Sequence, residues 1–456
     1  MREISPLDGR YAGAVGHLSA YFSEFALMAA RCEVELRYLV ALDEVGVFPK
    51  LTRAEKARIE AARAFTDEDF ARIKEIESAI RHDVKSCELF LREKLELAHP
   101  NRIHFALTSE DVNNLAYALL LARYRDREQL PQLRRLVAAL AERVERWKSA
   151  SFPARTHGQA ASPTTFGKEL AVFVHRLVRQ GRQLEALRLR GKLSGATGTY
   201  AAAVVARPDI DWIDFAERFV AALGLEPMAC TTQIDDGDGL AEYFAVTSRI
   251  NNIVLDLDID LWEYISRGDV VHRAVPGEVG SSTMPHKVNP IRFENSEGNL
   301  AVSTALLHTL ADKLTHSRMQ RDLSDSTAKR NIGVALAHAY LALEETLGGL
   351  GRVDLDPAEL RARVDAAPDV LAEAYQTMLR AEGTGDPYEA LRGLTRGKTI
   401  TLAELHEWIE GLPVDAKLKT RMKALRPSSY AGLAPTLCER VAAEAAVWLR
   451  CTSPSQ

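Results

Sequence analysis

The stretch Gly277-Glu-Val-Gly-Ser-Ser-Thr-Met-Pro-His-Lys-Val-Asn-Pro-Ile-Arg-Phe-Glu-Asn-Ser-Glu-Gly-Asn299 separates two long runs of apolar residues that are spaced as in helices. It begins with glycines and hydroxyl-bearing residues, and Pro285 bars one continuous helix from passing through it. The loop then gathers the polar side chains of Lys287, Asn289, Arg292 and Glu294. Polar loops on rigid helical frames are common places for chemistry. An exposed connector without a chemical role is the alternative.

Helical periodicity dominates the chain on both sides of this loop. Apolar residues from Leu133 to Trp147 recur at three- and four-residue steps, which predicts a helix over 131–150. The same spacing predicts helices within 20–100 and over 170–190, 209–222, 239–266, 298–315 and 326–349. We therefore expect an all-α fold with few strands.

One segment carries two conflicting patterns. Between residues 255 and 261, apolar residues alternate with Asp256, Asp258 and Asp260, as in a half-buried strand. The same apolar residues also continue a helical face that runs from Ile250 to Tyr264. Because the flanking pattern is long and helical, we predict a helix here.

Breaks in the periodicity divide the chain into three predicted domains. These are an N-terminal helical domain over 1–107, a central bundle over 108–350 that includes the loop 277–290, and a C-terminal helical domain over 351–456. The central helices exceed the usual length of about 11–12 residues. Long helices with more apolar surface than one chain can cover indicate a bundle shared between subunits, so we expect a homo-oligomer.

Composition excludes several classes of protein. The 456 residues carry a net charge of −5, which disfavours a nucleic-acid scaffold but leaves small anionic substrates possible. No apolar run is long enough to cross a bilayer, and the N-terminus lacks a signal-like apolar segment. The scattered cysteines form no CxxC pair, which argues against a zinc site or disulfide framework and favours a cytoplasmic location.

Four polar islands interrupt the helical pattern and supply the candidate functional residues. They are Arg10-Tyr11, Arg81-His-Asp83, Thr108 to Asp111 together with Arg155 to Gln159, and the loop already quoted. None has metal-ligand spacing, and the chain has no Walker loop or dinucleotide-binding glycine motif.

This inventory suits an elimination beside a carboxylate. Such a reaction needs a base, and it needs cations or N–H donors that hold the dianionic intermediate. Lys287 and Asn289 could bind a carboxylate, and Ser281 or Ser282 could close over it. A serine is too weak a base unaided, so N–H groups or Lys287 would have to stabilise its alkoxide. His157 could protonate the leaving group, with its tautomer fixed by an acidic partner.

Residue types alone leave structural alternatives open. Thr108 and Ser109 suit the N-terminus of a helix as capping residues. His157 could be a hydrogen-bonded structural histidine. Ordinary surface charges would account for another group, namely His82, Asp83, Arg318, Arg321 and Arg330.

The segment Gly280-Ser-Ser-Thr-Met-Pro-His-Lys-Val-Asn-Pro290 closely resembles the loop shared by the fumarase/aspartase superfamily of lyases. Members of this superfamily are all-helical tetramers that eliminate fumarate or a related group. The resemblance extends over essentially the whole chain.

Other segments resemble the adenylosuccinate lyase family within that superfamily. Arg155-Thr-His-Gly-Gln159 and Thr108-Ser-Glu-Asp111 follow its pattern, whereas other members usually have Thr-His-Leu-Gln and Ser-Xaa-Asn-Asp there. The opening Ser5-Pro-Leu-Asp-Gly-Arg-Tyr11 and the run Gln320-Arg-Asp-Leu-Ser-Asp-Ser-Thr327 resemble its bacterial branch.

The resemblance implies a carbon–nitrogen lyase of purine nucleotide biosynthesis. It would split adenylosuccinate into AMP and fumarate, and would release fumarate from the succinylocarboxamide ribotide SAICAR to give AICAR. Ser281 would be the base, and His157 the acid with Glu294 as its orienting partner. Lys287 and Asn289 would hold the succinyl carboxylates and the aci-carboxylate intermediate.

The resemblance also implies the contacts to the rest of the substrate. Thr108 and Ser109 would contact the succinyl group. The ribose phosphate would be held by Arg10, Tyr11, Ser326 and Arg330, and the pocket would be completed by Arg81, His82, Asp83, Gln233, Asn295 and Arg321. Each site would draw on three subunits of a homotetramer, with no cofactor and no metal.

Two alternatives come from different classes. One is another lyase of the superfamily, such as an argininosuccinate lyase or a carboxymuconate cycloisomerase. Gly158, where argininosuccinate lyases have Leu, disfavours the argininosuccinate option, and Arg10 with Tyr11 favours a nucleotide over an amino acid as substrate. The other is a non-catalytic helical scaffold, which the joint presence of all four predicted catalytic residues disfavours.

Overall fold

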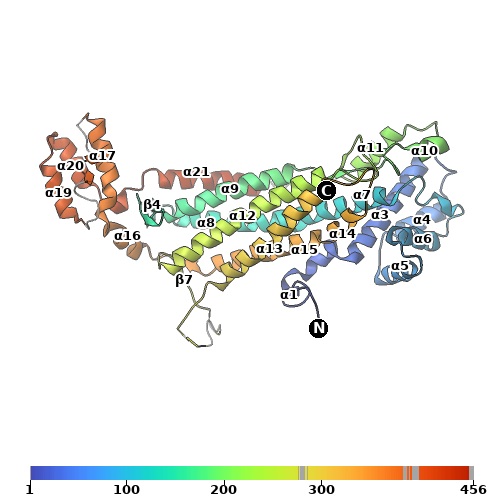
Figure 1. Ribbon diagram of the computed structural model, residues 1–456, viewed down its shortest axis with the longest axis horizontal. Helices are drawn as coiled ribbons and strands as arrows, with labels where there is room; N and C mark the ends of the chain where they lie inside the picture. The colour runs from blue at the N-terminus through green and yellow to red at the C-terminus, as the bar shows by residue number, and fades with distance from the viewer. Residues whose placement is uncertain are drawn as a thin grey trace. The chain divides into compact units, whose positions relative to one another are not determined.

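Helices make up most of the chain (Figure 1). A computed structural model describes residues 2–275, 277, 283–284, 286–383, 388–389, 391–392 and 400–450. Within these residues every strand is two residues long. The all-α prediction is therefore confirmed.

The longest helices follow the predicted apolar runs. They are α3 (Glu24–Glu44), α7 (Ser109–Tyr124), α8 (Leu130–Arg146), α9 (Phe166–Ala186), α12 (Asp238–Ser266), α13 (Ile291–Leu314) and α15 (Ile332–Leu350). Two predictions need correction. The helix predicted over 131–150 ends at Arg146, and the one predicted over 326–349 is interrupted by a turn at 330–331 that separates α14 (Ser324–Lys329) from α15.

The segment with two patterns is helical throughout, as part of α12. Asp258 is only 1% exposed, although the alternating pattern would place it in solvent. The hydroxyl of Thr346 donates to its carboxylate oxygens at 3.0 Å. Burial raises the pKa of Asp258 well above its usual range, which favours the neutral acid inside the helical layer.

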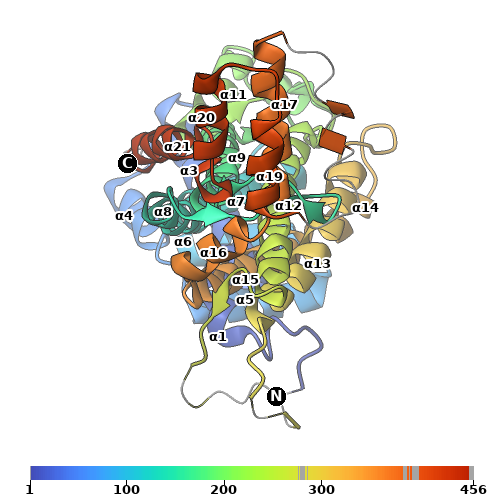
Figure 2. The ribbon, with the colours of Figure 1, turned by 90° about the vertical axis from the view of Figure 1, so that its left-hand side faces the viewer.

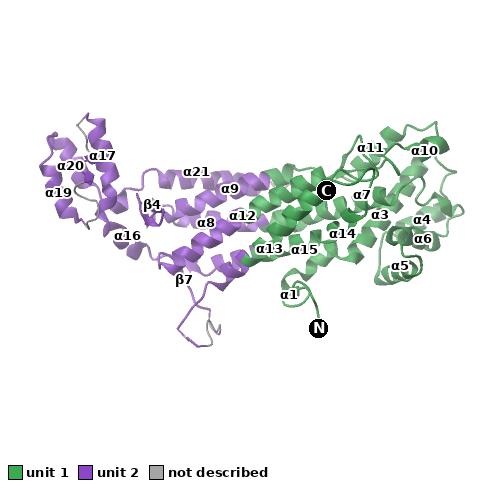
Figure 3. Cartoon of the chain, viewed as in Figure 1, with its two compact units in different colours: residues 1–132, 183–252, 298–342 green, residues 133–182, 253–297, 343–456 purple. Residues whose placement is uncertain are grey.

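The chain divides into two compact units (Figure 3). Unit 1 comprises Met1–Gln132, Gln183–Asn252 and Gly298–Ala342, and unit 2 comprises Leu133–Arg182, Ile253–Glu297 and Leu343–Gln456. The division into three domains at 107 and 350 stays a prediction.

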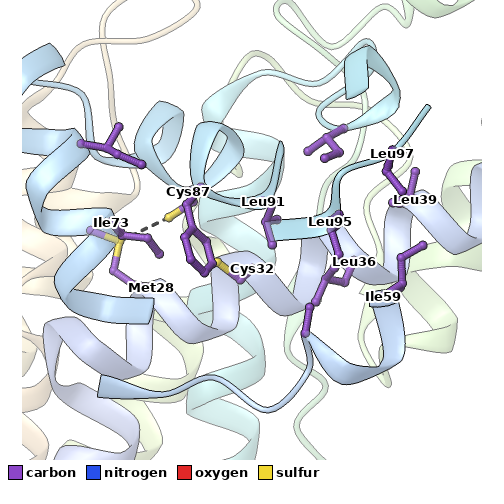
Figure 4. Close-up of a cluster of buried hydrophobic side chains, with 14 of the residues drawn as sticks. Met28, Cys32, Leu36, Leu39, Ile59, Ile73, Cys87, Leu91, Leu95 and Leu97 are labelled. Carbon is purple, nitrogen blue, oxygen red and sulfur yellow. Dashed lines mark hydrogen bonds between the residues drawn. The ribbon is translucent and has the colours of Figure 1, made fainter. Parts of the chain in front are cut away.

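Unit 1 contains an apolar core between α3 and the helices that follow it in sequence. Its shorter helices are α1 (Ala12–Val15), α2 (Ser19–Phe22), α4 (Arg53–Ala61), α5 (Asp67–Ile80), α6 (Asp83–Leu95), α10 (Ala201–Ala206) and α11 (Trp212–Ala222). Its 3₁₀ turns are Gly16–Leu18 and Pro100–Arg102, and a π turn spans Arg125–Gln129. Helix α3 packs against α6 and α7 (Figures 1 and 2). The buried side chains between α3 and α6 include Met28, Cys32, Leu36, Cys87 and Leu91 (Figure 4).

Short strands also occur in unit 1. Strands β5 (Arg190–Gly191) and β6 (Glu226–Pro227) pair in parallel, with Arg190 opposite Glu226. This pairing fixes the chain at the start of the Gly- and Ser-rich segment that follows Gly191.

Unit 2 contains three short antiparallel pairs and the C-terminal helices. Strands β1 (Ser151–Phe152) and β4 (Thr164–Thr165) pair, as do β2 (Arg155–Thr156) with β3 (Gln159–Ala160) and β7 (Val271–His272) with β8 (Val353–Asp354). The helices are α16 (Pro357–Asp365), α17 (Ala372–Ala381), α19 (Leu402–Glu410), α20 (Ala416–Ala424) and α21 (Ala434–Arg450), with 3₁₀ turns at Pro368–Leu371 and Pro427–Ser429. Helices α17, α19 and α20 lie side by side (Figure 2) over a core that includes Tyr375, Leu405 and Met422.

Among the residues described, no helix has both the length and the apolar character needed to span a membrane.

Candidate functional site

The predicted site residues divide between the two units. Unit 1 holds Arg10, Tyr11, Arg81, His82, Asp83, Thr108, Ser109, Gln233, Arg321, Ser326 and Arg330. Unit 2 holds His157, Lys287, Asn289, Glu294 and Asn295, together with Ser281. Ser281 and its neighbour Ser282 lie outside the described residues.

His157 occupies the tip of a tight hairpin in unit 2. Thr156 of β2 pairs with Gln159 of β3, so the loop between the strands is only His157 and Gly158. Both loop residues have positive φ, 51° for His157 and 73° for Gly158, as a hairpin turn that follows the strand twist requires. Arg155 Nη1 donates to the carbonyl of Gly158 at 2.9 Å. The turn leaves the imidazole exposed.

Glu294 lies in the first turn of α13, four residues after Pro290 ends the loop. Its Oε1 accepts a hydrogen bond from Trp262 Nε1 at 3.1 Å. No hydrogen bond joins Glu294 to His157 within the part of the chain that the structure describes. Their pairing as acid and orienting group stays a prediction.

The cationic end of the loop is open to solvent. Lys287 is exposed, and its backbone N–H donates to the carbonyl of Met284 at 3.1 Å, which forms a turn. Asn289 and Asn295 are half-buried. Unit 2 therefore presents an ammonium, an imidazole and a carboxylate on exposed positions, the inventory that acid–base chemistry requires.

In unit 1, Arg321 contacts two other predicted residues, Gln233 and Ser326. Its Nη1 donates to Gln233 Oε1 at 3.4 Å, and its Nη2 donates to Ser326 Oγ at 3.3 Å. The same Nη2 lies 3.0 Å from Glu110 Oε1. Arg321 is mostly buried, so the alternative of a solvated surface arginine does not describe it.

A cavity of about 270 Å³ in unit 1 contains two further predicted residues, Asp83 and Arg330. Arg31 and Lys329 contribute charge to the same wall. Arg31 Nη2 donates to Asp83 Oδ2 at 2.8 Å. Burial by itself would raise the pKa of Asp83, but the guanidinium of Arg31 outweighs it and holds that pKa below its usual value.

The turn before Asp83 explains the positions of its neighbours. Helix α5 ends at Ile80, and Arg81 has a left-handed backbone with φ 56°. His82 is the N-cap of α6, and its Nδ1 accepts the backbone N–H of Lys85 at 3.2 Å. Both side chains are exposed, whereas Asp83 is half-buried.

Two other predicted pairs lie at helix starts. Thr108 is the N-cap of α7 and Ser109 is its first residue, as the capping interpretation expects. Both are half-buried. Near the N-terminus the Arg10 guanidinium lies over the ring of Tyr11, 5.9 Å from its centroid, just before α1.

Sequence patterns did not reveal the buried charges that surround these residues. Lys329 is 4% exposed, and its Nζ lies 3.3 Å from both Asp235 and Asp325. Burial would lower the pKa of Lys329, but the carboxylates of Asp235, Glu110 and Asp325 raise it above its usual value. At Arg31 the available signal was a charged residue inside an apolar helical run, whereas Lys329 follows a polar stretch and offered no such signal. Most partners of these two cations, such as Asp83 for Arg31 and Asp235 for Lys329, are remote in sequence and cannot be read from spacing.

Within the described ranges, no group of three or more His, Cys, Asp and Glu side chains is arranged to hold a metal ion.

Comparisons with known proteins match nearly the whole chain to lyases. A family model described as lyase matches residues 9–303, and one described as adenylosuccinate lyase C-terminal matches residues 317–431. The adenylosuccinate lyase of Haemophilus influenzae is 44% identical over 447 residues, covering 96% of this chain and 98% of that protein. That of Escherichia coli is 43% identical over 449 residues, with the same coverage.

Solved structures agree on the fold. The 3-carboxy-cis,cis-muconate lactonizing enzyme of Pseudomonas putida superposes with a TM-score of 0.77 at 23% identity, covering 95% of this chain and 97% of that chain. A fumarate lyase from Mesorhizobium sp. BNC1 gives a TM-score of 0.77 at 19% identity, covering 94% and 97%.

Proposed function

The chain belongs to the adenylosuccinate lyase family, and we propose that it eliminates fumarate from adenylosuccinate, giving AMP, and from SAICAR, giving AICAR. The observation that carries this proposal is the 44% identity to a named adenylosuccinate lyase over 96% of the chain. The match over 317–431 supports it, because it concerns the C-terminal part of that family.

The proposed reaction is a β-elimination by a serine base and a histidine acid. Ser281 Oγ, as alkoxide, takes the proton from the succinyl carbon next to a carboxylate. The electron pair of the broken C–H bond moves first into that carboxylate, giving the aci-carboxylate, and then forms the C=C bond of fumarate as the C–N bond breaks. His157, as imidazolium, gives its proton to the departing nitrogen. Lys287 and Asn289 hold the charge that develops.

The geometry of His157 supports its role as acid. Its imidazole is exposed at a hairpin tip, where a substrate from solvent can reach it. A two-residue hairpin turn holds its backbone between two paired strands, so less conformational freedom has to be lost when the acid is positioned for reaction. Glu294, whose carboxylate is exposed in the first turn of α13, is the proposed orienting partner in the assembled enzyme.

The contacts of Arg321 support a substrate-binding role in unit 1. Its donors join Gln233 and Ser326, two residues proposed to bind substrate. A guanidinium with neighbouring hydroxyl and amide groups suits a phosphate or carboxylate. We assign the ribose phosphate to Ser326 and Arg330, with Arg10 and Tyr11.

We infer that the active enzyme is a homotetramer with sites shared between subunits. The long helices expose apolar side chains that a partner subunit would cover, namely Val172 of α9, Trp262 of α12 and Val302 of α13. The scattered cysteines favour a cytoplasmic location.

The test is a substrate panel followed by ultraviolet absorbance. Purified protein is mixed in turn with adenylosuccinate, argininosuccinate and a carboxymuconate. We expect turnover of adenylosuccinate alone, with release of AMP and fumarate. Turnover of argininosuccinate would assign the chain to another reaction of the superfamily, and turnover of none would favour the scaffold alternative.

A further inference from the structure

Asp111 and Lys192 form an ion pair that is completely buried. Lys192 Nζ lies 2.7 Å from Asp111 Oδ1, and both side chains are 0% exposed. Asp111 lies in the first turn of α7, and Lys192 directly follows β5. The two residues therefore join segments that are far apart in the sequence.

Asp111 holds two loops through their backbone N–H groups. Its Oδ2 accepts the N–H of Thr108 at 2.8 Å. Its Oδ1 accepts the N–H groups of Ser194 at 3.0 Å and Gly195 at 3.3 Å. One carboxylate thus fixes the start of α7 and the Gly- and Ser-rich segment after β5.

Lys192 holds the same segment and a third one through carbonyl groups. Its Nζ donates to the carbonyl of Gly195 at 3.1 Å and to that of Gln233 at 2.8 Å. The Gln233 side chain returns a hydrogen bond to the carbonyl of Ala196 at 2.9 Å. The backbone of Lys192 is itself fixed by Asn114, which accepts its N–H at 2.8 Å and donates to its carbonyl at 3.0 Å.

Stability alone is a poor reason for such a pair. Removing two charges from water is costly, and well-packed apolar residues of similar volume are often equally stabilising in the same place. A buried pair does, however, fix the orientation of the groups around it, because every donor and acceptor of both side chains must be satisfied. Here the satisfied groups are the backbones of Thr108 and Gln233, two residues proposed to bind substrate.

We propose that the Asp111–Lys192 pair positions Thr108, Ser109 and Gln233 for binding of the dicarboxylate end of the substrate. The inference rests on the proposed function. Neither member touches substrate, since both side chains are sealed from solvent. They are positioning residues that act through three backbone segments.

The test compares two double variants. Asp111→Asn with Lys192→Met removes both charges at nearly constant volume. The matched control is Asp69→Asn with Lys94→Met, which removes a similar pair away from all proposed site residues. Asp69 also accepts the N–H of a helix-capping threonine, Thr66, at 3.1 Å, and Lys94 Nζ lies 2.6 Å from Asp69 Oδ1.

We expect the variant of Asp111 and Lys192 to fold and to raise the KM for adenylosuccinate by about tenfold or more, as loss of charge-assisted hydrogen bonds does. Its kcat should fall by a smaller factor than its KM rises, and the control should keep the wild-type KM. An unchanged KM in a folded Asp111 and Lys192 variant would overturn the proposal, as would an equal rise in the control. Failure of the wild-type protein to turn over adenylosuccinate would instead contradict the proposed function.

A second measurement needs no variant and covers the case in which the double variant does not fold. Hydrogen exchange of the wild-type protein is followed with and without fumarate. Peptides that cover Thr108–Asp111, Lys192–Gly195 and Gln233 should gain protection together, because one ion pair links them. Protection confined to one of these segments, or absent from all, would overturn the proposal.

Discussion

Arg31 of α3 donates from its Nη2 to Asp83 at the start of α6, over 2.8 Å. The Arg31 side chain is only 4% exposed, and its Nε also donates to Asn113 Oδ1 of α7 at 2.8 Å. One buried cation therefore joins three helices and orients a carboxylate in the wall of the unit 1 cavity.

Substitution of this cation should cost more than substitution of an exposed one on the same helix. Arg31→Met removes the donor to Asp83 Oδ2 and to Asn113 Oδ1, and we expect a loss of about 2–3 kcal/mol in the free energy of unfolding. The matched control is Arg37→Met, which removes a surface pair with Glu33 and should cost less than about 1 kcal/mol. Urea unfolding measures both, and equal losses would contradict the structural role of Arg31.

Glu55 should give the unfolding free energy a specific pH dependence. Its carboxylate accepts the backbone N–H groups of Thr52 at 2.8 Å and Ala98 at 3.0 Å, which lower its pKa to about 2. Since the folded pKa lies below the unfolded value of about 4.3, the stabilisation is present above pH about 4.3 and is lost as the pH falls towards 2.

Glu55→Gln should therefore destabilise the protein at pH 7 and differ less from wild type as the pH falls to about 2. The control is Glu60→Gln on the same helix, whose side chain is 71% exposed and should show little effect at either pH. Urea unfolding at several pH values is the measurement. A constant difference for Glu55→Gln across this range would contradict the prediction.

The two proposed acid–base residues should each be required for turnover. Ser281→Ala removes the base, and His157→Asn removes the imidazole while keeping a residue that tolerates the left-handed backbone at φ 51°. Each should lower kcat by roughly 10²–10⁴-fold, with circular dichroism unchanged. Ser282→Ala is the control. Near-normal kcat in Ser281→Ala together with loss in Ser282→Ala would move the base to the neighbouring serine.

The hairpin that carries His157 should depend on Gly158. An alanine there keeps open space around its Cβ but must adopt φ 73°, which costs about 1 kcal/mol. Gly46 has φ 72° with equally open surroundings, and it lies outside the proposed site. Gly158→Ala should lower kcat several-fold through a displaced imidazole, whereas Gly46→Ala should leave kcat unchanged. Equal kcat in the two variants would show that the turn does not position the acid.

Shared sites predict complementation between inactive variants. Purified Ser281→Ala and His157→Asn proteins are mixed, dissociated gently and allowed to reassemble. Hybrid tetramers should contain some sites with both functional groups intact, so part of the activity should return. Homotypic controls should stay inactive after the same treatment. Reassembled hybrids without activity would contradict the shared site.

The spacing of apolar residues located the helices well, because a helix that buries one face needs apolar residues at three- and four-residue steps. The helix around Asp258 was predicted correctly despite its alternating pattern, because the longer helical face continued through it. The turn at 330–331 that separates α14 from α15 was missed. The residues of the turn, Arg330 and Asn331, are compatible with a helix, and no proline or glycine occupies either position.

The site could be predicted in its parts but not in its contacts. The loop from Gly280 to Pro290 and the Thr156-His-Gly-Gln159 segment are recognisable because their residue types occur at fixed local spacing. The link between Asp111 and Lys192 joins segments separated by most of α7, α8 and α9. A sequence pattern cannot show which buried charges meet, since their pairing is set by tertiary packing.

Product stoichiometry tests the proposed elimination most directly. Purified protein is incubated with adenylosuccinate, and AMP and fumarate are separated and quantified over time. We predict that both appear in equal amounts, at the rate at which adenylosuccinate disappears, and that neither forms with Ser281→Ala. Purified, folded, tetrameric protein that leaves adenylosuccinate intact would contradict the proposal.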